Sequence, residues 1–181
     1  WRAEAVAQTK AYCQSHSGGE FLWNAKPRFG KTLSVYDFCK QVDAQTVLIV
    51  TNRPAIANSW YSDYVRFLGR ESGYLFVSHV DALAGQPHVL DEQGYLDAAA
   101  QGEALYKRIE FVSLQDMKGS KYFGGEYDKL RHLTELNWDV LVIDEAHEGA
   151  DMITQCVINL MSNAMRYTPE GGWVVVKVKN D

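Results

Sequence analysis

The chain has 181 residues, 46% of them hydrophobic and 23% charged, which is the composition of a globular protein with a core of its own. Its formal net charge of −5 argues against a wholly basic, histone-like nucleic-acid binder, although a local basic groove is still compatible with it. No stretch approaches the roughly 20 apolar residues of a membrane span and no signal-peptide pattern opens the chain, so we expect a cytoplasmic protein without membrane contact.

The first third of the chain alternates between helical and strand periodicity. The run TVLIV is continuous and β-branched, as expected for a strand covered on both faces. The turn NRP ends this run, and a helical pattern rich in aromatic residues follows. The pattern predicts helices over residues 2–16, 33–42 and 56–67, and strands between them over residues 20–24 and 46–50. This order is typical of a parallel sheet with crossover helices.

The middle of the chain, residues 69–137, has a weaker pattern. Strands are predicted over residues 74–78 and 109–113, and polar or short helices over residues 95–106 and 130–136. A glycine-rich loop, GSKYFGGEY, lies between them at residues 119–127. A second buried strand, VLVI at residues 140–143, then leads directly into the sequence DEAH.

Two further features are the spacing of the cysteines and the identity of the first residue. The cysteines Cys13, Cys39 and Cys156 have neither metal-ligand nor CxxC spacing, which favours idle thiols in a reducing compartment. The sequence begins at Trp1 rather than at a methionine, so we expect a fragment of something longer.

The segment AKPRFGKT, residues 25–32, has the form of a phosphate-binding loop with alanine in place of the first glycine. A tight strand-to-helix turn of this kind aims backbone N–H groups and a helix N-terminus at an anion. The Lys31 ammonium would reach the β- and γ-phosphates of a nucleotide, and the Thr32 hydroxyl would bind Mg²⁺. The alternative is a chance GKT in a surface turn. The nucleotide-binding residues predicted here are Ala25, Arg28, Phe29, Gly30, Lys31 and Thr32.

The sequence DEAH supplies the complementary acidic groups. Asp144 ends a buried strand, the position from which a carboxylate coordinates Mg²⁺, and Glu145 beside it can polarise the attacking water. A helix N-cap after a strand is the alternative for this sequence taken alone. The two motifs occur in the right order, each after its own strand, and together they predict a site for Mg²⁺-ATP.

These segments resemble motifs I and II of superfamily-two helicases and translocases. Residues 47–64 are similar to the motif Ia region, and residues 111–115 to the strand and loop that follow it. The resemblance covers residues 1–151 and is nearest to the ATPase subunits of type I and type III restriction systems. It implies a DNA-translocating motor in which Arg53 and Ser113 contact the DNA backbone. A solvated surface arginine is the alternative for Arg53.

The resemblance has gaps. The adenine-reading glutamine of the family would lie near Arg2, and Gln8 is an uncertain substitute. Motif III and the second lobe, which carries the arginine finger, have no counterpart in the sequence. We therefore expect weak or no hydrolysis by the isolated chain, and a second helicase lobe and other restriction subunits as partners, together with DNA.

The last thirty residues have a different character. Residues 155–172, QCVINLMSNAMRYTPEGG, resemble the N box of sensor histidine kinases, a helix and turn followed by a strand. Asn159 and Asn163 would share one helix face. The resemblance implies that Asn163 holds Mg²⁺-ATP, while Arg166 reaches phosphate and Tyr167 lies near the nucleotide. An ordinary amphipathic helix with a returning strand is the alternative. The kinase's other motifs are absent, so we interpret residues 152–181 as foreign to the lobe, joined near Asp151.

The sequence thus predicts an α/β fold, with a mainly parallel sheet and flanking helices as in RecA-like lobes, plus a short helix and strand at its end. The predicted function is Mg²⁺-dependent ATP hydrolysis that drives DNA translocation in a restriction system. A histidine-kinase ATPase fragment and a catalytically incomplete nucleotide-binding fragment are the alternatives. Because Lys177 and Lys179 would be costly to bury, the strand at residues 173–179 is predicted at a sheet edge or apart from the sheet.

Overall fold

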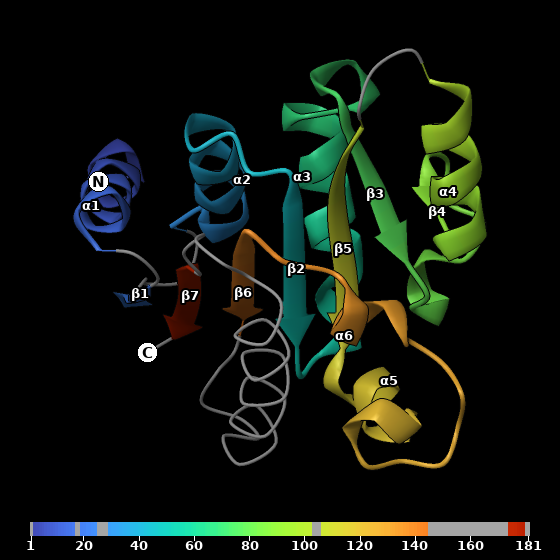
Figure 1. Ribbon diagram of the computed structural model, residues 1–181. Coiled ribbons are helices and arrows are strands. Elements are labelled where there is room, and N and C mark those ends of the chain that lie inside the picture. The colour runs from blue at the N-terminus through green and yellow to red at the C-terminus, as the bar shows by residue number, and fades with distance from the viewer. Residues whose placement is uncertain (1, 17–18, 25–28, 103–105, 145–173, 180–181) are drawn as a thin grey trace.

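One parallel sheet organises the computed structural model, which describes residues 2–16, 19–24, 29–102, 106–144 and 174–179. Seven strands pair in the order β1-β7-β6-β2-β5-β3-β4, and each pairing between these described strands is parallel (Figure 1). The predicted α/β fold with a mainly parallel sheet is confirmed. The strands are β1 (Gly19–Asn24), β2 (Thr46–Thr51), β3 (Tyr74–Ser78), β4 (Val89–Leu90), β5 (Lys107–Ser113), β6 (Val140–Asp144) and β7 (Val174–Lys179).

Helices cover both faces of the sheet and create two cores. The larger core joins the sheet to α1, α2 and α3, and the smaller one joins the opposite face to α5, α6 and Trp138. Within the described residues, no helix combines the length and the apolar character needed to cross a membrane. The α-helices are α1 (Arg2–Ser15), α2 (Lys31–Gln41), α3 (Ala57–Phe67), α4 (Glu92–Gln101), α5 (Leu114–Gly119) and α6 (His132–Glu135).

Strand β2 shows why this sequence builds two cores. Successive side chains of a strand point to opposite faces. Val47 and Ile49 accordingly lie in the larger core, whereas Leu48 and Val50 lie in the smaller one. A continuous apolar run is therefore what a central strand of a doubly covered sheet requires.

Several predicted elements are displaced in the structure. The helix predicted for residues 95–106 is α4, which starts earlier because Asp91 caps it by accepting a hydrogen bond from the Gly94 amide at 2.7 Å. The helix predicted for residues 130–136 shortens to the single turn of α6. The glycine-rich loop overlaps the end of α5 and contains a 3₁₀ turn, Lys121–Phe123. Strand β4 was not predicted, since two residues carry no periodicity.

Strand β7 contradicts the prediction made from its sequence. It pairs with β1 on one side and with β6 on the other, so it is an inner strand between those that lead to Lys31 and Asp144. The edge prediction was wrong because it assumed that an inner strand would have to bury Lys177 and Lys179 in the middle of the sheet. Lys177 and Lys179 occupy the carboxyl-terminal half of the strand, and pairing on both sides satisfies the backbone groups of three strands at once. The helix predicted for residues 152–166 lies outside the described residues.

Candidate nucleotide-binding site

The turn into α2 has the backbone geometry that a phosphate-binding loop needs. Gly30 precedes the helix with φ 83° and ψ 41°, in the left-handed region that favours glycine. A Cβ on Gly30 would lie 3.1 Å from Cδ of Arg2, so space is also short at this position. The helix begins with the Ser34 amide donating to the Gly30 carbonyl at 3.0 Å. The turn therefore places the N-terminus of α2, the end of a helix that favours an anion, directly after Gly30.

Lys31 and Asp144 meet at the carboxyl end of the sheet. The Lys31 ammonium lies 3.1 Å from Oδ1 of Asp144, although the two residues come from motifs 113 positions apart. The Asp144 side chain is 4% exposed and that of Lys31 is 18% exposed. The structure thus brings together the two charged groups that were predicted to bind phosphate and Mg²⁺.

Trp60 completes the surroundings of the Asp144 carboxylate. Its indole Nε1 donates to Oδ2 of Asp144 at 3.0 Å, so each carboxylate oxygen has a donor of its own. The indole is fixed in turn, because the Tyr36 hydroxyl donates to the Trp60 carbonyl at 2.8 Å and the two rings pack edge to face. Tyr36 and Trp60 come from α2 and α3, so both helices that follow the first two strands help to orient the acidic group.

No pattern in the sequence predicts this contact. Trp60 lies within residues 47–64, the segment that resembles the motif Ia region. Its burial could have been inferred from the aromatic spacing of Trp60 and Tyr64 along α3. Its hydrogen-bond partner Asp144 could not have been inferred, because the bond joins residues 84 positions apart in the chain.

The residues predicted to contact DNA lie at the same end of the sheet. Thr51 of β2 is in register with Asp144 on one side and with Ser113 on the other. Arg53 is exposed just beyond β2, and its amide donates to the Thr51 hydroxyl at 3.0 Å. Ser113 is buried and caps α5, its hydroxyl accepting from the Asp116 amide at 3.1 Å. The DNA contacts of Arg53 and Ser113 stay predictions.

The remaining predicted residues are only partly described. Phe29 and Thr32 are half-buried, Thr32 being the second residue of α2. The loop and tail residues of the prediction lie outside the described residues: Ala25, Arg28, Glu145, Asn159, Asn163, Arg166 and Tyr167.

The groups that are described fit Mg²⁺-ATP. An ammonium at a helix N-terminus suits a polyphosphate, and a carboxylate suits Mg²⁺, which prefers oxygen ligands. Lys31 and Asp144 neutralise each other at 3.1 Å. Binding of the nucleotide would replace this pairing, with the ammonium turning to phosphate and the carboxylate to the metal.

The family model described as "Type III restriction enzyme, res subunit" matches residues 3–168. The chain belongs to this family. The resemblance to a helicase-type ATPase lobe of restriction enzymes is thereby confirmed. The match to the res-subunit family runs past the boundary predicted near residue 151, and that division of the chain stays a prediction.

Two individual proteins resemble the chain, one in sequence and the other in fold alone. The chain is 30% identical over 156 residues to the C-terminus of a putative type II restriction enzyme and methyltransferase of Mycoplasma pneumoniae. That match covers 83% of the chain but 20% of the relative, so this res-subunit lobe spans about a fifth of the curated protein. The fold of the chain is similar to that of the UvsW helicase from bacteriophage T4. The TM-score is 0.58 at 9% identity, and the match covers 99% of the chain and 58% of the helicase.

Proposed function

We propose that this lobe binds Mg²⁺-ATP between α2 and the end of β6, and that hydrolysis there drives DNA translocation in a restriction system. The observation that carries the proposal is the 3.1 Å contact between the Lys31 ammonium and the Asp144 carboxylate at the carboxyl end of a parallel sheet. Ligands of open parallel sheets bind at this end of the strands. Membership of the res-subunit family supports the same assignment.

Each residue has a proposed role. Lys31 holds the β- and γ-phosphates, and the amides at the start of α2 bind the same anion. Thr32 and Asp144 hold Mg²⁺, which when bound neutralises the charge that develops on the phosphates. Trp60 keeps the Asp144 carboxylate oriented through its 3.0 Å hydrogen bond. Glu145, the next residue along the chain, positions and polarises the attacking water.

The partners and the location are also proposals. We infer that DNA contacts Arg53 and the segment around Ser113, because both lie at the carboxyl end of the sheet beside the nucleotide site. A second helicase lobe would supply an arginine finger, a group worth about 10³–10⁵ in rate in related phosphoryl transfer. Other restriction subunits would complete a cytoplasmic complex.

Calorimetry with ATP and Mg²⁺ tests the nucleotide site. Lys31→Ala should weaken binding about ten- to a hundredfold, since a hydrogen bond to a charged group contributes about 1.5–3 kcal/mol. Lys40→Ala is the matched control, because Lys40 is an exposed lysine in the last turn of the same helix. Asn163→Ala tests the histidine-kinase alternative. If Lys31→Ala binds ATP normally and Asn163→Ala does not, the helicase-type site is refuted.

A further inference from the structure

A second polar site lies on the face of the sheet opposite to α2 and α3. It surrounds the carboxylate of Glu110, which has no role in the proposed ATPase site. Glu110 is in the middle of β5 and is 0% exposed. Its neighbours Ile109 and Phe111 belong to the larger core, so Glu110 points to the side of α6. Burying a carboxylate costs several kcal/mol unless it is paired or binds a metal. Glu110 therefore requires partners.

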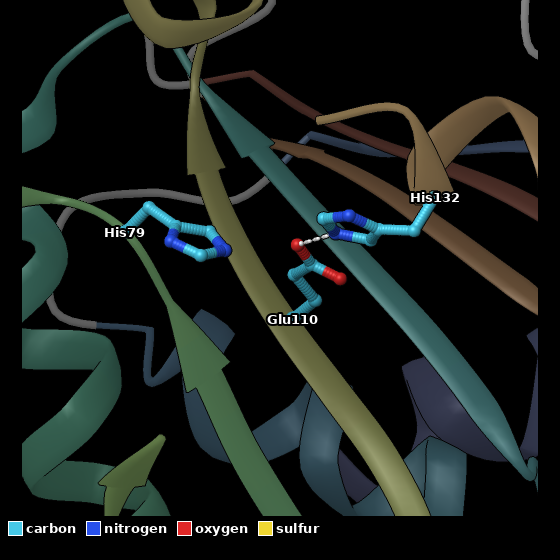
Figure 2. A group of neighbouring side chains, drawn as sticks. All are labelled: His79, Glu110 and His132. Carbon is cyan, nitrogen blue, oxygen red and sulfur yellow. Dashed lines mark hydrogen bonds and ion pairs between the residues drawn. The ribbon is translucent and has the colours of Figure 1, made fainter. Parts of the chain in front are cut away.

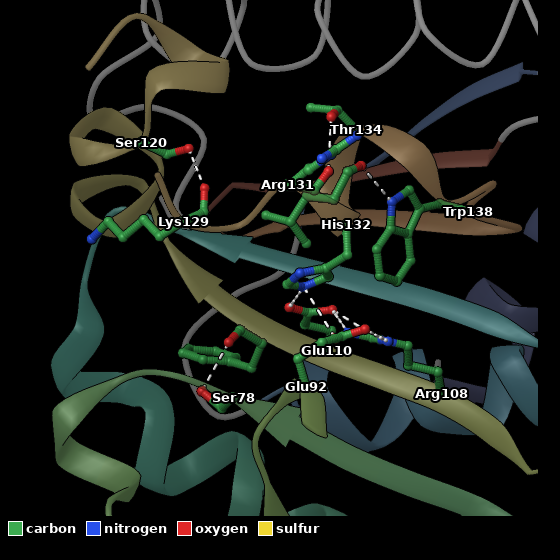
Figure 3. A network of polar contacts seen from close by, with 12 residues as sticks. Ser78, Glu92, Arg108, Glu110, Ser120, Lys129, Arg131, His132, Thr134 and Trp138 are labelled. Carbon is green, nitrogen blue, oxygen red and sulfur yellow. Dashed lines mark hydrogen bonds and ion pairs between the residues drawn. The ribbon is translucent and has the colours of Figure 1, made fainter. Parts of the chain in front are cut away.

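Arg108 and His132 are the partners of Glu110, one for each carboxylate oxygen (Figure 3). Oε2 of Glu110 accepts from Nε of Arg108 at 2.9 Å and from Nη2 at 2.6 Å. Oε1 lies 2.7 Å from Nε2 of His132. Arg108 also donates to both oxygens of Glu92, with Nη1 lying 3.2 Å from Oε1. One oxygen of Glu110 is thus held by a guanidinium while the other faces an imidazole.

A third element brings a second imidazole to the same point. His79 directly follows β3, is exposed, and points toward Glu110 from the side opposite to His132 (Figure 2). One ligand atom from each of His79, Glu110 and His132 lies within 4.8 Å of the other two. The two imidazole ring centroids are 6.1 Å apart. Residues from β5, α6 and the end of β3 therefore converge on one small volume.

The charges of this cluster leave room for a cation. The cluster contains two carboxylates, Glu92 and Glu110, but one guanidinium, that of Arg108. When its two histidines are neutral, the cluster therefore carries an excess negative charge. A divalent cation would offset this excess negative charge.

We propose that His79, Glu110 and His132 bind a divalent transition-metal ion of the Zn²⁺ class. Two imidazoles and one carboxylate are ligands that favour Zn²⁺ and its neighbours over Mg²⁺ or Ca²⁺, which prefer oxygen alone. The site is therefore chemically distinct from the Mg²⁺ site at Asp144. Among the described residues, His79, Glu110 and His132 are the group with this ligand composition and spacing.

The distances allow this coordination after small side-chain rotations. Ligands at about 2.0–2.2 Å from a tetrahedral ion are about 3.3–3.6 Å from one another. His132 Nε2 and Glu110 Oε1, now 2.7 Å apart and sharing a hydrogen bond, would separate slightly as the metal replaces the shared proton. The more distant ligand atoms, within 4.8 Å, would move closer. His79 can adjust most easily because its side chain is exposed.

The surroundings supply the outer partners and an open position. Arg108 holds the Glu110 oxygen that would not bind the metal, which is the role of the hydrogen-bonded partners behind most ligating carboxylates. His79, Glu92 and His132 border a cavity of about 510 Å³. A water from this cavity, or Glu92 with Oε2 3.5 Å from His132 Nε2, can complete the coordination.

Calorimetric titration with ZnCl₂ tests the proposal on the full chain, free of tag and nucleotide after treatment with a chelator. One equivalent of Zn²⁺ should bind and raise the melting temperature. His79→Gln and His132→Gln should each weaken binding at least about tenfold, the smallest loss typical even of residues behind the ligands. His16→Gln is the matched control, because His16 is an exposed histidine at the end of α1.

Three results would overturn the site. The first is Zn²⁺ binding by His79→Gln that equals that of the unaltered chain, and the second is the absence of any saturable binding. In the third, a thiolate-to-metal charge-transfer band on addition of Co²⁺ would assign the ion to a cysteine. Glu110→Gln can fail to fold because Arg108 loses a partner, so exposed His79 carries the decisive comparison.

Discussion

Replacing Trp60 by phenylalanine would isolate the hydrogen bond that orients the Asp144 carboxylate. Trp60 is 1% exposed and Asp144 is 3% exposed, so water cannot readily replace the lost indole donor. A hydrogen bond to a charged group contributes about 1.5–3 kcal/mol, and the smaller ring adds the cost of a partial cavity. We expect Trp60→Phe to lower the free energy of unfolding by about 2–4 kcal/mol, a large share of the 5–15 kcal/mol of an ordinary domain.

Trp138 provides the same substitution with a neutral acceptor. It is 2% exposed, and its Nε1 donates to the Leu133 carbonyl at 3.0 Å. Neutral hydrogen bonds contribute about 0.5–1.5 kcal/mol, so Trp138→Phe should cost roughly 1 kcal/mol less than Trp60→Phe. Urea unfolding followed by far-ultraviolet circular dichroism measures both variants. Equal costs, or a larger cost for Trp138→Phe, would refute the importance of the charged acceptor.

Two further predictions concern activity and pH. Glu145→Gln should leave Mg²⁺-ATP affinity unchanged and abolish the weak turnover expected of the chain, measured by calorimetry and phosphate release, because in the proposed site its carboxylate acts on water rather than on the metal; a tenfold loss of affinity would contradict this role. Glu92 has a pKa below its ordinary value, through the hydrogen bonds and charge of Arg108 that exceed the opposing effect of burial. Its contribution to stability is present above the ordinary glutamate pKa of about 4.3 and is lost as the pH falls through the lowered value. Glu92→Gln should therefore destabilise the protein in urea at neutral pH and much less near pH 3; an equal loss at both pH values would count against the pairing with Arg108.

Local patterns were sufficient to predict the central strands and the two motifs. Strands β2 and β6 are unbroken apolar runs, and such runs are diagnostic when both faces of a strand are buried. The position of Lys31 and Asp144 followed from the rule that parallel strands end at one edge of the sheet. Their proximity therefore needed no knowledge of distant contacts.

The features that escaped prediction depend on pairings across the fold. The place of β7 follows from the backbone groups of β1 and β6, which no pattern within β7 itself records. The His79, Glu110 and His132 cluster joins residues from three elements, and the two histidines look ordinary in their own segments. Only Glu110 gave a signal, as a charge inside an apolar strand, and its partners depended on how α6 packs.

The inner position of β7 has a consequence for how the protein is synthesised. Gly19 of β1 pairs with Val174 of β7, so β1 leaves the ribosome before β2 to β6 while its described partner follows all of them. At about 5–20 residues per second, translation needs a few seconds to pass from β6 to the end of β7. During that interval the nascent chain contains β1 but not β7, the strand with which β1 pairs. The arrangement of β1 beside β7 and β6 is thus a late event, and until then β1 and one edge of β6 lack the strand with which both pair.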